Sequence, residues 1–92
     1  MGRCSYDKLK HIEPALKEIR MLEKIKEPKP GIFYLKSQGF LHFHESEGKI
    51  WADVKDGVDW GVPINIPDKA GSVFLKKFVI EVIKRYESSL KK

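Results

Sequence analysis

Apolar side chains recur every three or four residues near both ends of the chain, and every second residue between them. Residues 5–26 show the stripe of an amphipathic helix that buries one side, and residues 69–88 show a broader stripe of the same kind. Pro14 interrupts the first stripe, so we expect this helix to kink or restart near Glu13. The pattern therefore predicts one helix near each end of the domain.

The middle of the chain has the composition of β-strands. Short segments rich in β-branched and aromatic residues alternate with glycine-containing turns, which is typical of an antiparallel meander. These segments are residues 32–36, 40–45, 50–55 and 59–66. We therefore predict one α+β domain over residues 1–92, a two-layer sandwich in which the N-terminal and C-terminal helices cover one face of a four-stranded meander at 32–66, in the order α-β-β-β-β-α.

The first two turns of the meander set the register of its strands. A three-residue loop at 37–39 places Leu35 opposite Leu41, and a four-residue loop in the next turn places Phe43 opposite Ala52. Because side chains alternate across a strand, one face of the sheet becomes apolar and the other polar and aromatic. We expect the helices to cover the apolar face.

The third turn, an Asp-Gly sequence, leaves two alternatives. A two-residue turn places Val62 on the polar face, whereas a three-residue loop places Trp60, Val62 and Ile64 in the core. We prefer the second because it buries more apolar surface. Pro63 cannot donate a hydrogen bond to a neighbouring strand, so we expect the fourth strand at an edge of the sheet.

The polar-aromatic face is the candidate binding site. The predicted register puts His42 opposite Asp53 as a cross-strand pair, and His42 with Asp53 as its orienter could act in acid–base catalysis, although no nucleophile accompanies them. We expect no metal and no cofactor. If a metal binds, its candidate ligands are His42, His44 and Asp53, together with a further ligand or water. The candidate binding residues are Tyr34, Lys36, Phe40, His42, His44, Trp51, Asp53 and Lys55.

Composition narrows the class of protein. The net charge of +5 favours binding to polyanions only if the excess of basic residues gathers on one face of the domain. We interpret the lysines of the two predicted helices, including Lys24 and Lys26, as solvated surface residues. Cys4 is the one cysteine, which excludes an intrachain disulfide and indicates a reducing compartment. The chain shows neither a signal-peptide pattern nor an apolar run of membrane-spanning length, so we expect a soluble, cytoplasmic protein without membrane association.

Two stretches resemble small uncharacterised bacterial and archaeal domains of the YjbR type, in which a helix precedes a meander with an aromatic strand. The stretches are IFYLKSQGFLHFH at residues 32–44 and IWADVK at residues 50–55. The resemblance implies the same order of a helix followed by a meander. It also implies the DNA-binding role that is suspected for that group.

These observations predict a small cytoplasmic binding module that acts through its open sheet face, by self-association or with a protein partner. Nucleic acid is the alternative, because Tyr34, Phe40 and Trp51 beside lysines are similar to open sheets that stack single-stranded bases. A His-Asp or metal-assisted enzyme is a further alternative, although phosphate-loop, dinucleotide-loop and nucleophile-elbow motifs are absent from the sequence. The sequence specifies neither the ligand nor the biological process.

Overall fold

The computed structural model describes residues 2–91, with side chains from residue 4 onward. None of the helices in this part of the chain combines the length and the apolar character needed to cross a membrane. In chain order the elements are β1 (Gly2–Arg3), the 3-10 helix η1 (Tyr6–Ile12), α1 (Glu13–Arg20), β2 (Ile25–Lys29), β3 (Ile32–Leu35), β4 (Gln38–Ser46), β5 (Lys49–Asp56), β6 (Asp59–Trp60), β7 (Ile64–Ile66) and α2 (Ser72–Leu90).

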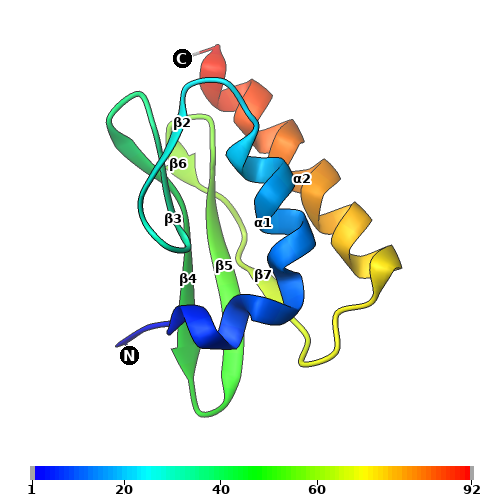
Figure 1. Cartoon of the computed structure of the whole chain (residues 1–92). Coiled ribbons are helices and arrows are strands. Elements are labelled where there is room, and N and C mark those ends of the chain that lie inside the picture. The colour runs from blue at the N-terminus through cyan, green and yellow to red at the C-terminus, as the bar shows by residue number, and fades with distance from the viewer. Residues whose placement is uncertain (1, 92) are drawn as a thin grey trace.

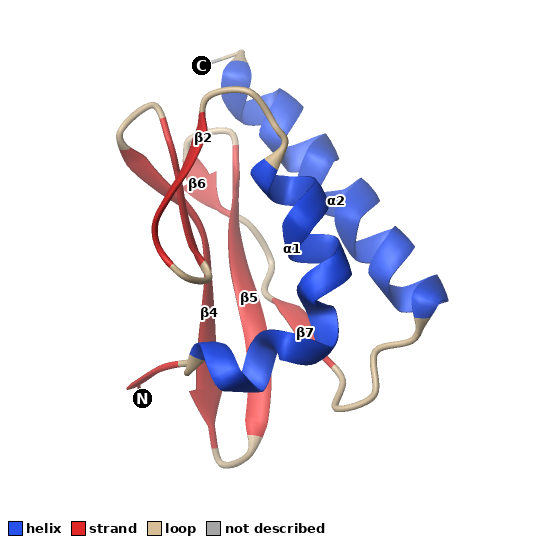
Figure 2. Cartoon of the chain, viewed as in Figure 1, coloured by secondary structure: helices blue, strands red, loops and turns tan. Residues whose placement is uncertain are grey.

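The elements form two layers, an antiparallel sheet and a pair of helices (Figures 1 and 2). The strand order is β2-β3-β4-β5-β6, and two short strands extend it, because β1 pairs with β4 and β7 pairs with β5. Helices α1 and α2 lie side by side on one face of the sheet (Figure 1). The predicted α+β fold with two helices on one face is confirmed, although the described sheet has seven strands and not four.

The N-terminal helix predicted over residues 5–26 is three elements, η1, α1 and β2. Pro14 lies in the first turn of α1, where a proline sacrifices no helical hydrogen bond, and α1 begins at Glu13 as the sequence predicts. The helix ends at Arg20, and Lys24, with a φ of 69°, redirects the chain into β2. Ile25 then pairs with Leu35. The position of Ile25 in the sequence fits the helical stripe, but its side chain reaches the core from strand β2. The predicted helix is too long because a strand residue continues the apolar spacing of the helix.

The turn between β3 and β4 is shorter than the sequence predicts. Lys36 and Ser37 form a two-residue turn with φ angles of 54° and 66°, a backbone conformation found in two-residue hairpins. Leu35 therefore lies opposite Gln38, and the predicted pairing of Leu35 with Leu41 is wrong.

A β-bulge follows this turn and changes the side on which one aromatic residue lies. Tyr34 pairs with Gly39, and Phe33 pairs with Leu41, so Phe40 is an extra residue on β4. Phe40 and Leu41 are consecutive, yet both are buried, with 1% and 0% of their surface exposed. The prediction that Phe40 belongs to the binding face is wrong, because strict alternation does not continue through a bulge.

The pairing of β4 with β5 is confirmed, with His42 opposite Asp53 and Phe43 opposite Ala52. The preferred geometry of the third turn is wrong. Lys55 pairs with Trp60 after a two-residue turn, which puts Trp60 on the side of the sheet away from the helices, where it is 45% exposed.

The chain after Trp60 crosses from β6 to β7. Val62 is 76% exposed in this crossing, against the expectation that it is buried, whereas Ile64 packs against the core and Ile66 is buried, as expected of this strand. Pro63 lies between the two strands, and β7 pairs with β5 alone among the described strands, so the predicted edge position is confirmed.

Helix α2 packs against β5 and carries a buried arginine. It spans Ser72–Leu90, against the predicted 69–88. Arg85 is 7% exposed, and its Nη1 donates hydrogen bonds to the carbonyls of Val62, at 3.0 Å, and Val54, at 3.3 Å. Its Nε contacts the Glu81 carboxylate at 2.8 Å. Arg85 therefore ties the crossing between β6 and β7 to both α2 and β5.

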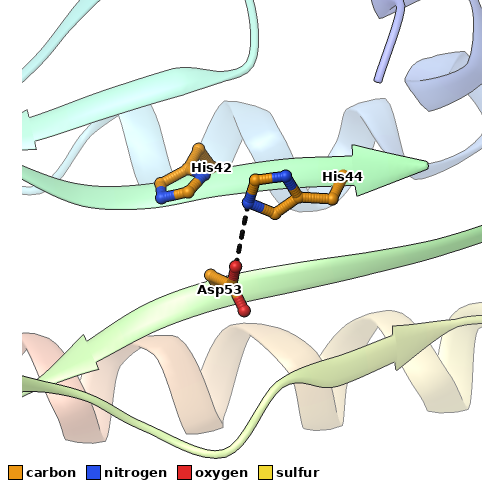
Figure 3. Close-up of side chains that lie close together, drawn as sticks. All are labelled: His42, His44 and Asp53. Atoms are coloured by element: carbon orange, nitrogen blue, oxygen red, sulfur yellow. Dashed lines mark ion pairs between the residues drawn. The ribbon is translucent and has the colours of Figure 1, made fainter. Parts of the chain in front are cut away.

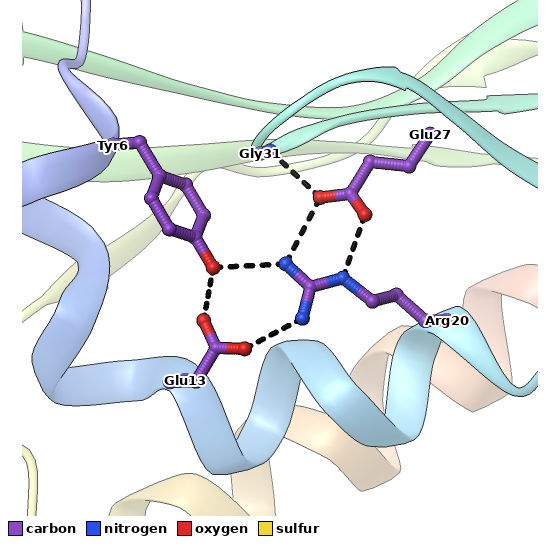
Figure 4. Close-up of polar contacts among 5 residues, drawn as sticks. All are labelled: Tyr6, Glu13, Arg20, Glu27 and Gly31. Atoms are coloured by element: carbon purple, nitrogen blue, oxygen red, sulfur yellow. Dashed lines mark hydrogen bonds and ion pairs between the residues drawn. The ribbon is translucent and has the colours of Figure 1, made fainter.

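A second arginine joins the N-terminal elements to the sheet (Figure 4). Arg20 makes ion pairs of 2.6 Å with Glu13 and with Glu27, and its Nη2 donates to the Tyr6 hydroxyl at 2.9 Å. Tyr6 in turn donates to Glu13, and Glu27 accepts the Gly31 amide at 2.9 Å. The hydrogen bond from Tyr6 and the pairing with Arg20 hold the pKa of Glu13 below its ordinary value. This network links η1, α1 and the turn between β2 and β3.

Candidate functional site

The side of the sheet opposite the helices carries most of the predicted binding residues, and the helices of residues 2–91 lie on the other side (Figure 1). We call this side the open face. The structure brings together on it all the predicted residues except Phe40 and Lys36, and adds Trp60. Lys36 lies in the turn after β3, and its Nζ donates to the Leu90 carbonyl at the end of α2. Strand pairing and alternation place on it Tyr34, His42, His44, Trp51, Asp53, Lys55 and Trp60.

The centre of the open face is a cluster of two histidines and one carboxylate (Figure 3). His42 and His44 project from β4 on the same side, and Asp53 projects toward them from β5, with the helices behind the strands. His42 lies directly opposite Asp53, as predicted, while Nε2 of His44 makes a 2.9 Å contact with Oδ2 of Asp53. The side chains of His44 and Asp53 are 18% and 24% exposed, so solvent reaches this contact from one side.

Aromatic rings extend this cluster in both directions along the open face. His42 and His44 meet edge to face, with ring centroids 4.5 Å apart. His44 stacks on Trp51 at 5.6 Å with an interplanar angle of 25°, and His42 meets Trp60 at 4.7 Å. The ammonium of Lys55 lies 5.4 Å from the Trp60 ring centroid, in the range of a cation–π contact. Four rings and a cation therefore form one continuous row across β4, β5 and β6.

A basic hollow lies beside this row, at the β2–β3 end of the sheet. It encloses about 390 Å³ and is bordered by three lysines and an exposed tyrosine. Lys26 pairs with Tyr34 across β2 and β3, which puts both on the open face. Nζ of Lys36 donates to the Leu90 carbonyl at 3.3 Å, which holds this side chain near the end of α2. The lining residues are Lys24, Lys26, Pro28, Tyr34, Lys36 and Ser37.

Sequence reasoning missed three residues of this surface, and a signal existed for each. A two-residue turn after β5 would have placed Trp60 on the polar face, but the preference for burial overrode this signal. The helical stripe predicts a helix at Lys24 and Lys26, although Lys24, Lys26 and Pro28 alternate with Ile25 and Glu27, as expected of a strand. The tertiary structure therefore gathers part of the basic charge that the sequence presented as scattered.

The open face combines three kinds of chemistry. The exposed rings of Tyr34 and Trp60 offer flat surfaces for stacking, its lysines offer cations for phosphate or carboxylate groups, and the two imidazoles with Asp53 offer nitrogen and oxygen ligands. Alternation places one carboxylate of strands β2 to β6 on this face, Asp53, and it already contacts His44. The surface is therefore suited to an anionic ligand with flat groups.

A scan against protein-family models and searches of the curated proteins and of the solved structures found no match to this chain. The resemblance to YjbR-type domains stays a prediction from two short stretches of sequence.

Proposed function

We propose that the protein is a binding module whose open face holds single-stranded nucleic acid. The observation that carries the proposal is the row of contacting rings, from Trp51 through the histidines to Trp60, directly beside a hollow bordered by three lysines. Proteins that hold single strands place aromatic rings where bases stack and place cations where the phosphates run. The DNA-binding role suspected for YjbR-type domains agrees with this proposal.

The charge of the open face favours an anionic partner over a second copy of the chain. Lys24, Lys26 and Lys36 border the hollow and Lys55 lies over Trp60, whereas the carboxylate of Asp53 is engaged by His44. An isologous contact through this face would bring like charges together, which opposes association. Self-association, a different protein partner and a cytoplasmic location remain predictions.

The test is a fluorescence anisotropy titration with a labelled oligothymidylate, at several salt concentrations and with EDTA present. We expect affinity to fall steeply as salt rises, because bound lysines release counterions. Trp60→Ala should weaken binding roughly 5- to 150-fold, the range that corresponds to about 1–3 kcal/mol for one stacked base. Trp51→Ala should act in the same direction.

The matched control is Ile80→Ala, which removes a 66% exposed apolar side chain from α2, on the other side of the sheet. We expect its affinity to equal that of the unmodified chain. Absence of binding at low salt, affinity indifferent to salt, or an equal loss in the control would each contradict the proposal. A dimer that Trp60→Ala dissociates, seen by light scattering without any oligonucleotide binding, would instead assign the open face to self-association.

A further inference from the structure

The His42–His44–Asp53 cluster has a geometry that goes beyond nucleic-acid binding. One ligand atom from each of the three side chains lies within 4.8 Å of the other two. A divalent ion held at 2.0–2.2 Å needs ligand atoms roughly 3–3.5 Å apart, so the three atoms are already close to the spacing that such an ion requires. We infer that His42, His44 and Asp53 form a binding site for a divalent transition-metal ion.

The backbone already supplies the alignment that such a site needs. His42 and His44 are separated by one residue on a regular part of β4, so both rings leave the same face of the strand. Asp53 lies on the neighbouring strand directly opposite His42, and its Oδ2 is already 2.9 Å from Nε2 of His44. Coordination therefore requires no change in the pairing of β4 with β5.

The flanking tryptophans hold the two imidazoles in place. Trp51 stacks on His44 with an interplanar angle of 25°, and Trp60 meets His42 edge-on at 85°. These contacts restrict the imidazole rings before an ion binds, which reduces the conformational entropy that they lose on binding it and favours affinity.

The ligand chemistry selects the class of metal. Two imidazole nitrogens and one carboxylate oxygen suit zinc and the neighbouring first-row divalent ions, whereas magnesium and calcium prefer oxygen ligands throughout. Three protein ligands leave at least one coordination position of such an ion for water or for a bound group. The site therefore belongs to the open class, in which the metal can take an exogenous ligand.

The test is a calorimetric titration of EDTA-treated protein, without a histidine tag, with Zn²⁺ alone. We expect one ion per chain, and at least a 10-fold loss of affinity in His42→Gln, His44→Gln and Asp53→Asn, since even supporting residues of metal sites cost about that much. The matched control is His11→Gln. The Nε2 of His11 lies 3.0 Å from the Pro67 carbonyl, outside the cluster, and its loss should leave the affinity unchanged.

A second measurement uses the unmodified chain and does not depend on how the variants fold. In NMR spectra of the histidine side chains, Zn²⁺ should shift the ring signals of His42 and His44 and leave those of His11 unchanged. Absence of binding, binding that persists in the His42→Gln/His44→Gln double variant, or a shift at His11 alone would overturn the inference. Because this titration contains no oligonucleotide and the anisotropy titration contains EDTA, failure of either proposal is distinguishable from failure of the other.

Discussion

The backbone of Gly61 lies against the guanidinium of Arg85, so close that a Cβ atom at residue 61 would come within 2.8 Å of Nη1. The arginine is held there by the carbonyls of Val54 and Val62. The Gly61 amide donates to the same Val54 carbonyl at 2.9 Å. This contact fixes the point at which the chain leaves β6 and crosses toward β7.

We therefore predict that Gly61→Ala destabilises the domain by about 1–3 kcal/mol, the usual cost of overpacking a filled site. The added methyl group would displace the guanidinium from both carbonyls, and the Val62 carbonyl would lose the hydrogen bond from Arg85, whereas the Val54 carbonyl would keep the one from the amide of residue 61. The measurement is urea-induced unfolding followed by circular dichroism. Gly39→Ala is the control, because a Cβ there meets only the Trp60 ring, at an ordinary 3.7 Å. In an Arg85→Ala background the cost of Gly61→Ala should shrink, and an unchanged cost would contradict the steric explanation.

A second prediction concerns the bulge. Phe40 is 1% exposed, so Phe40→Ala should cost about 3–5 kcal/mol, the range for removing a buried aromatic ring. Tyr34→Ala on the open face, where 39% of the residue is exposed, should cost much less. Denaturant unfolding of both variants measures the difference. Equal and small losses would mean that Phe40 lies on the open face, as simple alternation predicts.

A third prediction concerns acid stability. The pKa of Glu13 is held below its ordinary value of 4.5 by the hydrogen bond from Tyr6 and by Arg20, so at acid pH the unfolded chain binds this proton more readily than the folded one. The stability that Glu13 contributes is complete above the unfolded-state pKa and is lost as the pH falls through the lower folded-state pKa.

The free energy of unfolding, measured in urea at constant ionic strength, should therefore decline below about pH 4.5, and Glu13→Gln should reduce the steepness of that decline. Glu18→Gln, an exposed carboxylate on the same helix, serves as the control. A decline of the same steepness in Glu13→Gln would show that other carboxylates account for the acid sensitivity.

A fourth prediction concerns the basic hollow and rests on the proposed nucleic-acid function. If Lys26 neutralises one phosphate of a bound single strand, Lys26→Ala should reduce the slope of log affinity against log salt concentration by about 0.7. The control is Lys84→Ala, an exposed lysine of α2 on the helical side of the sheet. The anisotropy titration measures both. Identical slopes for the two variants would mean that the lysines of the hollow do not contact the bound strand.

The predictable part of the structure follows local rules. The turn between β4 and β5 and the alternation of apolar residues determine the pairing of His42 with Asp53, so this register could be derived from the residues alone. Pro14 likewise marks where α1 begins, because a proline is compatible with the first turn of a helix and incompatible with its interior. The candidate cluster was predictable for the same reason, since its members are neighbours on two adjacent strands.

The errors occur where a residue satisfies two patterns and distant parts of the chain choose between them. The spacing of Ile25 fits a helix, but pairing with Leu35 makes it part of a strand, and this carries Lys24 and Lys26 to the edge of the open face. Phe40 leaves the open face because the tight turn at Lys36 and Ser37 sets Tyr34 opposite Gly39, and the bulge that follows lets both Phe40 and Leu41 face the core.

The sequence by itself determined the two-layer α+β class, the central hairpin and the side of that hairpin on which His42, His44 and Asp53 lie, because periodicity and turn chemistry act between close neighbours in the chain. Only the tertiary structure decided that Trp60 joins the histidines and that lysines from β2 gather beside them. Local patterns left both turn geometries for Trp60 and both the helix and the strand for Lys26 open, and pairing between distant segments, with the contacts of Arg85 to the crossing after β6, chose between them.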